Sequence, residues 1–126
     1  MSLRQQNLGS IIKPGFNPLG TQTPTYVYNL FAWGDNSAGQ LGQSNLTPYS
    51  SPKQVGLLTN WSQVTAGYSG AMLALKTDGT LWSWGLNTSG QLGLGNITYY
   101  SSPKQIGALA TWKTVSIYLY TAMGLN

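Results

Sequence analysis

The sequence contains no cysteine, no histidine and no glutamate, and charged residues make up only 6% of its 126 positions. Without cysteine there is no disulfide framework and no thiolate metal site, and without histidine a second common ligand of transition metals is missing. Asp35 and Asp78 are the only carboxylates, and both lie in turn-like sequences without an evident partner for acid–base catalysis. We therefore expect no metal, no cofactor and no enzymatic activity.

The sequence also lacks the usual features of nucleic-acid and membrane binding. Its net charge of +4 comes from basic residues that are spread thinly along the chain, whereas a nucleic-acid footprint needs them clustered on one face. No apolar run reaches the length of about 18 residues that a membrane-spanning helix requires. The first 20 residues lack the apolar centre of a secretory signal. We expect neither nucleic acid nor membrane as a partner.

An internal repeat dominates the rest of the sequence. A shift of 51 residues aligns positions 30–75 with positions 81–126 without a gap, and 22 of the 46 aligned residues are identical. A period of about 50 residues is typical of propeller blades rather than of helical repeats. The aligned identities include Trp33 with Trp84, Trp61 with Trp112, GQLG at 39–42 with 90–93, and YSSPKQ at 49–54 with 100–105.

Each repeat is predicted to consist of strands. Residues 71–76 and 81–85 are apolar runs on either side of Asp78-Gly79, a dipeptide that favours a tight hairpin turn. Residues 61–67 predict another strand, and residues 25–34 correspond to the strand after the turn. The segments GQLGLGN and YSSPKQ are rich in turn-forming residues and are predicted to be loops. No apolar stripe of helical period is present.

The segments AMLALKTDGTLWSWG, GQLG and SSPKQIG, in this order, resemble the RCC1 repeat, the unit of RCC1-like β-propellers. The resemblance covers roughly residues 30–126, and its low charge is similar to that of repeats in phage and bacterial surface proteins. It implies an all-β fold of propeller blades: about two repeats (30–80 and 81–126, the second cut short) in an incomplete ring. The family's best-known member is a chromatin-bound guanine nucleotide exchange factor, but the repeat motifs are packing elements and imply no exchange activity here.

The large residues of the repeats are expected to pack the blades. We expect the four repeated tryptophans to be largely buried, each with its indole N–H on a backbone carbonyl, and the repeated leucines to fill the core. Tyr49 and Tyr100 occupy the same place in each repeat, so they are candidates for stacking on a ligand, although repeated packing explains them as well. The blade-packing residues are Trp33, Trp61, Trp84, Trp112, Leu41 and Leu92.

Two repeats cannot close a propeller. Residues 26–33 lack a hairpin partner, and residues 118–124 lack the strand that follows them in the first repeat. One hypothesis is that residues 118–124 of one copy pair with residues 26–33 of the next, in closed rings of an even number of blades. The alternative is that the chain is a fragment of a longer protein with further repeats. Both hypotheses remain open at this point.

Residues 1–24, ahead of the domain of two repeats at 25–126, have no periodic pattern. Three prolines and several glycines separate isolated apolar residues, which suits an extended, irregular arm that becomes ordered on a partner. A disordered tail is the alternative. The expected anchors of the arm are Leu8, Ile11, Ile12, Phe16 and Leu19.

These observations predict a structural or assembly protein. We expect a bacteriophage virion component, either a capsid decoration or a tail or fibre protein, anchored to other virion proteins through residues 1–24. It would be assembled in the host cytoplasm and located in the virion. The alternative is a lectin-like module that binds a carbohydrate or receptor on the host surface, with Tyr49, Tyr68, Tyr99 and Tyr100 stacking on sugars.

Overall fold

The computed structural model describes residues 26–126, and the arm and its five expected anchors lie outside this range. Eight strands and no helix occur in the described part of the chain. The strands are β1 (Asn29–Gly34), β2 (Tyr49–Thr59), β3 (Trp61–Ala66), β4 (Ala71–Lys76), β5 (Leu81–Gly85), β6 (Tyr100–Gln105), β7 (Thr114–Tyr118) and β8 (Thr121–Leu125).

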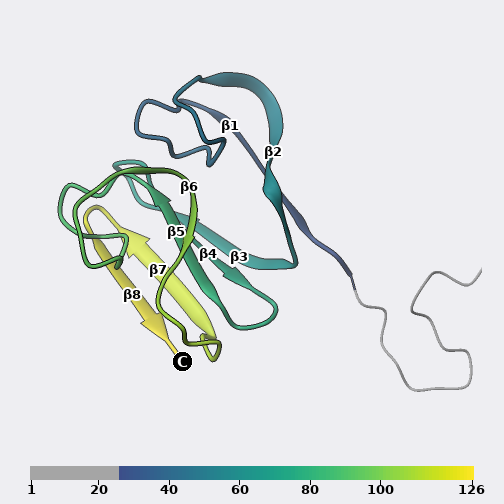
Figure 1. The fold of residues 1–126 in the computed structure, drawn as a ribbon, viewed down its shortest axis with the longest axis vertical. Helices are drawn as coiled ribbons and strands as arrows, with labels where there is room; N and C mark the ends of the chain where they lie inside the picture. Colours follow the sequence, from purple (N-terminus) through teal and green to yellow (C-terminus); the bar gives the residue numbers. More distant parts are fainter. Residues whose placement is uncertain (1–25) are drawn as a thin grey trace, which may run out of the picture.

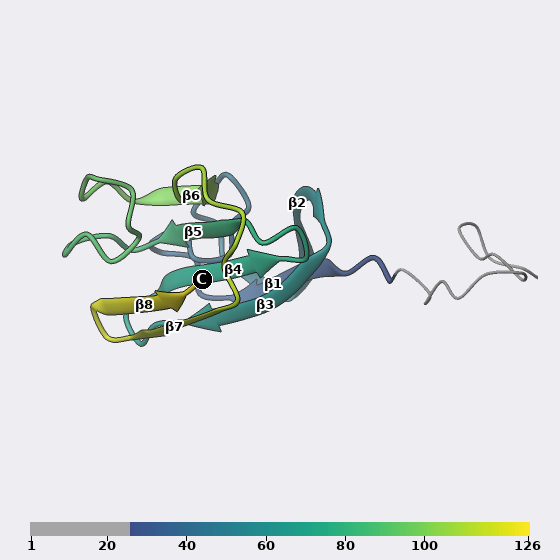
Figure 2. The same ribbon diagram turned by 90° about the horizontal axis from the view of Figure 1, so that it is seen from below.

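The strands form three antiparallel sheets that follow one another along the chain (Figures 1 and 2). The central sheet has the order β3-β4-β5-β6 and is one complete propeller blade. The pair β1-β2 lies on one side of it, and the pair β7-β8 lies on the other side (Figure 1). The chain therefore contains one whole blade between two half-blades, which confirms the all-β architecture of RCC1-like blades in an incomplete ring.

The blade and the sequence repeat are out of phase. The repeat boundary falls between β4 and β5, so each repeat contributes two strands to one blade and two strands to the next. The expected hairpin is present, with Leu75 opposite Leu81 and Gly79 at a φ of 81° in its turn. Because every repeat is divided between two blades, the covalent chain itself holds neighbouring blades together.

The prediction of loops for YSSPKQ was wrong. The segment forms the start of β2 and the whole of β6, which are the outer strands of their sheets. An outer strand bonds to a neighbour on one side only, so Pro52 and Pro103 can lie within it without removing a ladder hydrogen bond. The composition of this segment resembles that of a turn because an edge strand tolerates the same residues.

Two hydrophobic clusters lie at the two junctions of the complete blade. Between the blade and β7, Ala71, Leu73, Leu81 and Leu92 pack with Val115 and Ile117. Between the blade and β1-β2, the buried residues Trp61, Ala74 and Trp84 are joined by Leu30 and Leu58. The clusters fix both half-blades to the central blade.

Candidate functional site

Two long loops are held in shape by buried asparagines. Asn36 and Asn87 are fully buried and occupy the same position in each repeat. The Nδ2 of Asn87 donates to the carbonyls of Asn96 and Thr98 at 2.9 and 3.0 Å, and its Oδ1 accepts from the amide of Leu92 at 3.0 Å. The Asn36 side chain makes the corresponding bonds to Asn45, Thr47 and Leu41. One amide side chain thus replaces the backbone pairing that an irregular loop lacks.

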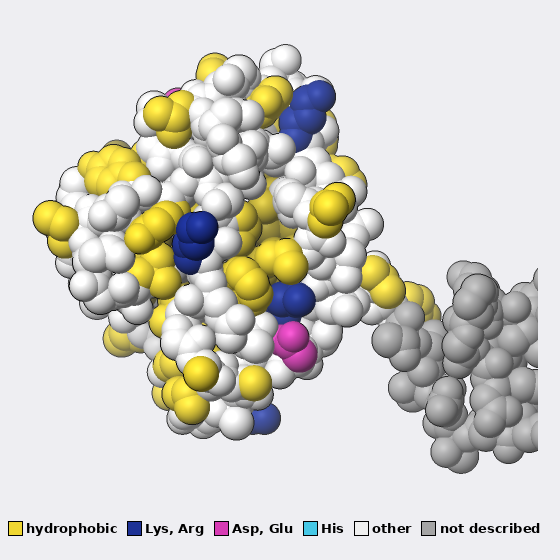
Figure 3. All heavy atoms as spheres, in the orientation of Figure 1, with side chains coloured by type: hydrophobic (Ala, Val, Ile, Leu, Met, Phe, Trp, Pro, Cys, Tyr) yellow, Lys and Arg dark blue, Asp and Glu magenta, His cyan; other side chains and the backbone are white. Residues whose placement is uncertain are grey.

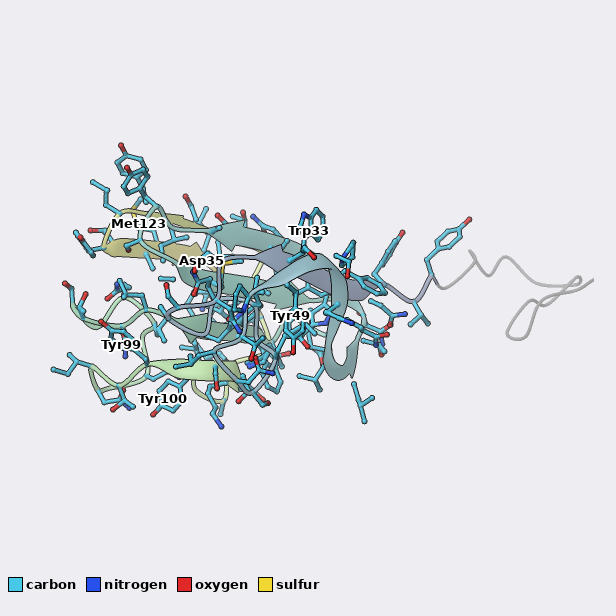
Figure 4. All side chains as sticks on the ribbon, turned by 90° about the horizontal axis from the view of Figure 1, so that it is seen from above. Trp33, Asp35, Tyr49, Tyr99, Tyr100 and Met123 are labelled. Atoms are coloured by element: carbon cyan, nitrogen blue, oxygen red, sulfur yellow. The ribbon has the colours of Figure 1, made fainter. Side chains whose placement is uncertain are left out.

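The two repeated tyrosines hold these loops through hydrogen bonds to their hydroxyl groups. The hydroxyl of Tyr100 accepts from Asn96 Nδ2 at 3.1 Å, and the hydroxyl of Tyr49 accepts from Asn45 Nδ2 at 3.2 Å. Lys104 lies over the ring of Tyr100, with its Nζ 5.6 Å from the ring centroid, and Lys53 covers Tyr49 in the same way. Both tyrosines, labelled in Figure 4, therefore take part in the framework of their loops, and both side chains are only partly exposed.

The repeated tryptophans do not share one environment. Trp61 and Trp84 are buried and donate their indole N–H groups to the carbonyls of Leu58 and Gln40, as expected. The expected hydrogen bond of Trp112 was wrong: its side chain is half-buried, and its Nε1 has no partner in the described part of the chain. The expectation of a buried Trp33 was wrong, because its side chain is 60% exposed. In the described chain no strand lies beside β1 in the way that β4 lies beside β5. The repeated leucines, Leu41 and Leu92, are buried in the core.

The first loop is locked onto the next blade. The carbonyl of Gln40 accepts the indole N–H of Trp84 at 2.9 Å, and the amide of Ser44 donates to the carbonyl of Ser101 at 2.7 Å. A Cβ atom at Gly39 would lie 2.7 Å from the Cα of Ser101, so only glycine allows this close approach. These contacts fix the first loop to the central blade.

The loops at one end of the blades form a continuous face. We call residues 35–48, 67–70, 86–99 and 119–120 the loop face, because the strand directions bring all four segments to the same end of the sheets (Figure 2). The Ser69 hydroxyl donates to the carbonyl of Leu119 at 3.3 Å, which joins two of the segments. The exposed hydrophobic residues of the loop face are Leu46, Tyr68, Ile97, Tyr99, Leu119 and Tyr120.

The loop face carries almost no charge. Asp35 is its one ionisable side chain other than tyrosine. Figure 3, in the orientation of Figure 1, shows the Lys and Asp side chains of the molecule as separate patches among uncharged ones. Hydrogen bonds from the hydroxyl and the amide of Ser37 lower the pKa of Asp35. Asp35 also accepts from Gln40 Nε2 at 2.6 Å. In the second repeat, Leu86 stands at the position of Asp35. Gln91 is the counterpart of Gln40, and its buried Nε2 has no hydrogen-bond partner in the described structure.

The described residues lack a cluster of side chains that could hold a metal. No group of three His, Cys, Asp or Glu side chains is close enough to hold a metal ion in this part of the chain. Among the described residues there is also no helix with the length and hydropathy to cross a bilayer. What the loop face does offer is a set of exposed apolar side chains. Sequence reasoning named Tyr68 and Tyr99 but missed Leu46 and Ile97, whose shared repeat position was the available signal.

The model of the regulator of chromosome condensation (RCC1) repeat matches residues 29–74 and 78–117, and a second model of this repeat matches residues 61–91. The chain belongs to the RCC1 repeat family. It is 40% identical over 90 residues to the human protein "Probable E3 ubiquitin-protein ligase HERC3", a match that covers 69% of this chain and 8% of that protein. A bifunctional serine/threonine-protein kinase/NEDD4-like E3 ubiquitin-protein ligase of Dictyostelium discoideum is 42% identical over 85 residues, or 62% of this chain and 4% of that one.

Solved structures show the same fold. Human WBSCR16 matches with a TM-score of 0.62 and 24% identity, covering 72% of this chain and 25% of that chain. Yeast RCC1 (Prp20), in a structure with Kap60 bound, matches with a TM-score of 0.57 and 25% identity over 70% of this chain and 21% of that chain. The chain therefore spans less than a third of the length of these relatives.

The comparisons overturn the predicted function and location. The relatives are cellular proteins of eukaryotes, including HERC ligases and yeast RCC1, and not capsid decorations or tail fibres. The prediction of a bacteriophage virion protein, its virion location and the phage or bacterial surface type were therefore wrong, and the lectin alternative has no support from these relatives. A low charge content is compatible with many exposed β surfaces, so it could not identify a virion.

Proposed function

We propose that this chain is a protein-binding module and that the loop face is the surface that contacts its partner. The observation that carries the proposal is the set of exposed apolar tips on a fixed framework: Leu46 and Ile97 stand at the same position of two loops anchored by Asn36 and Asn87. Exposed hydrophobic groups on a rigid backbone lose little conformational entropy on binding, which favours affinity.

The relatives support a protein as the partner. One structure that shares the fold shows Kap60 bound to yeast RCC1, and another reports the binding of Prp20p from Saccharomyces cerevisiae to Gsp1p and histones. RCC1-type blades in those proteins thus belong to molecules with protein partners. Two carboxylates at separate turns give the described residues little means of catalysis, so the proposal is binding and not an enzymatic reaction.

The chemistry of the loop face defines the kind of partner. Tyr68, Tyr99 and Tyr120 combine apolar rings with hydroxyl groups, and the surrounding loops add amide and hydroxyl side chains. Such a surface fits a protein patch that is itself apolar and weakly charged. Because Asp35 is the one charged group on the face, affinity should change less than about threefold between low and physiological salt.

Site-specific photocrosslinking tests the proposal. A photoreactive phenylalanine analogue is placed at Ile97 or Tyr68 on the loop face, and at Leu57 or Leu109 at the opposite end as equally accessible controls. Adducts with one cellular protein are expected from the loop-face positions only. With that partner purified, Ile97→Ser and Tyr68→Ser should each weaken binding about tenfold, whereas Leu57→Ser should not. Equal adducts from both ends, or none from either, would overturn the proposal.

A further inference from the structure

Two strand edges of the described chain have no partner, and they are complementary. β1 bonds to β2 on one side only, and β8 bonds to β7 on one side only. By the 51-residue repeat, β1 is the counterpart of β5 and β8 is the counterpart of β4, and β4 and β5 pair with each other in the complete blade. We propose that β8 of one copy pairs with β1 of a second copy, so that β7-β8 and the second copy's β1-β2 form one shared blade.

The internal repeat fixes the register of this pairing. In the complete blade, Met72 lies opposite Trp84 and Ala74 lies opposite Trp82. The same register places Met123 opposite Trp33 of the second copy. It also places Leu125 opposite Phe31 of the second copy. The strands run antiparallel, and the shared blade has the order β7-β8-β1-β2, which matches β3-β4-β5-β6.

The side chains at these edges are exposed where their repeat counterparts are buried. Trp33 is 60% exposed and Trp84 is fully buried, although both occupy the same position of their repeats. Val64 is 46% exposed and its counterpart Val115 is 4% exposed. Every residue of β8 is exposed, whereas β4 is mostly buried. The apolar character of these positions is retained, so a neighbouring blade is the missing cover.

A groove beside β1 lies where the incoming hairpin would pack, and apolar side chains form part of its lining. It has a volume of about 370 Å³ and lies between β1 and β3, with Leu30, Trp61 and Val64 among its lining residues. On the other side of the complete blade, β7 packs on β3 and β4. The β7-β8 hairpin of another copy would pack on the groove in the same way and would cover Val64.

The second loop, residues 86–99, provides a further match. Gln40 accepts the indole N–H of Trp84 from the next blade, so Gln91 in the following repeat would accept that of Trp33 from the second copy. A Cβ atom at Gly39 would meet Ser101, whereas one at Gly90 would meet nothing closer than 3.9 Å. The space beside Gly90 is the place for Ser50 of the second copy. In Figure 4, the side chain of Trp33 projects away from the ribbon.

A second copy is the occupant because each copy carries both halves of the interface. Neither β1 (NLFAWG) nor β8 (TAMGL) contains the charged residue or proline that commonly protects an exposed edge from pairing. The contact is head-to-tail and therefore builds closed rings if the rotation closes. This inference is independent of the proposed function.

Cysteine crosslinking tests the register, since the natural chain has no cysteine. Directly opposed residues on antiparallel strands are close enough for a disulfide. The double variant Phe31→Cys and Leu125→Cys should form covalent dimers and larger species on mild oxidation. Phe31→Cys with Ala122→Cys, three residues out of register, is the matched control and should remain uncrosslinked. Equal crosslinking of both pairs, or of neither, would overturn the proposed register.

Sedimentation of charge variants tests the assembly. The wild-type chain should sediment as a discrete multiple of 13.5 kDa. Trp33→Glu and Met123→Lys should each dissociate it by placing one charge in the shared blade. The variant with both changes should reassociate, because the two introduced charges are opposite in sign and face each other across the interface. Trp33→Lys with Met123→Lys should stay dissociated. Near-ultraviolet circular dichroism reports whether each variant keeps its packed tryptophans. A folded, monomeric wild-type chain, or association that survives both single changes, would overturn the proposal.

Discussion

Trp33 and Trp84 occupy the same position of successive repeats, yet the first is 60% exposed and the second is fully buried. The difference arises from the neighbouring elements: Trp84 lies opposite Met72 on β4 and donates its indole N–H to Gln40 of the preceding loop, whereas the corresponding edge of β1 has no partner in the described chain. Identical sequence thus gives a core residue in a complete blade and a surface residue in a half-blade. Whether the blade is complete, and not the sequence motif, determines whether this tryptophan is buried.

Trp84→Phe should lower the free energy of unfolding by about 1–3 kcal/mol, because it removes the hydrogen bond from a fully buried indole to the carbonyl of Gln40. Trp82→Phe is the matched control. Trp82 is only half-buried, so water can replace the bond from its indole N–H to the hydroxyl of Thr80, and we expect a loss below about 1 kcal/mol. Urea unfolding followed by fluorescence measures both. An equal loss in the two variants would show that the bond between Trp84 and Gln40 does not join the blades.

Asn87→Asp should destabilise the second loop. A carboxylate can still accept from the amide of Leu92, but it cannot donate to the carbonyls of Asn96 and Thr98 and would be buried in place of a neutral amide. We expect a loss of about 2–4 kcal/mol, measured by chemical denaturation. Thr88→Ala, at the exposed neighbouring residue, should change the stability by less than about 0.5 kcal/mol. No loss in Asn87→Asp would contradict the anchoring role.

Leu86→Asp should raise the urea midpoint. It recreates the first-repeat arrangement, in which Gln40 Nε2 donates to Asp35, and so supplies an acceptor for the unpartnered Nε2 of Gln91. Leu86→Ala serves as the control, since it removes the same side chain without adding an acceptor. A midpoint for Leu86→Asp at or below that of Leu86→Ala would show that the second loop cannot form this bond.

Stability should be nearly independent of pH between about 5 and 8, because the chain has no histidine and no glutamate. Hydrogen bonds from Ser37 lower the pKa of Asp35, and hydrogen bonds from Thr80 lower the pKa of Asp78. The unfolded chain therefore takes up these protons first as the pH falls, and the stability present above the unfolded pKa near 3.8 is lost below it.

Acid unfolding of the wild-type chain and of the Asp35→Asn, Asp78→Asn double variant checks this prediction. The double variant should show a flatter decline of stability below about pH 4, because the two groups with lowered pKa values are gone. An unchanged decline would mean that other groups control acid unfolding.

The repeat predicted most of the fold because its motifs are dictated by packing. The hairpin around Asp78-Gly79, the buried Trp61 and Trp84 and the all-β class follow from local residues alone. The outer strands were missed, since Pro52 and Pro103 are acceptable on a sheet edge and in a loop alike. The exposure of Trp33 was missed because it depends on whether another strand lies beside β1, and none does in the described chain.

The loop face was only partly predictable. Asn36 and Asn87 align in the repeat, but their bonds to residues nine and eleven positions away appear only when the loop is folded. The predicted function was wrong because composition constrains solubility and surface chemistry and does not identify a partner.

The pairing of β8 with β1 of a second copy is the central claim about the open edges, and amide hydrogen exchange tests it most directly. In the assembled chain, the amides of residues 122–125 and 31–33 that face away from β7 and β2 should exchange as slowly as those of β4 and β5. Met123→Lys should remove this protection and leave β4 and β5 protected. Fast exchange at 122–125 in the wild-type chain, while β4 and β5 remain protected, would contradict the claim.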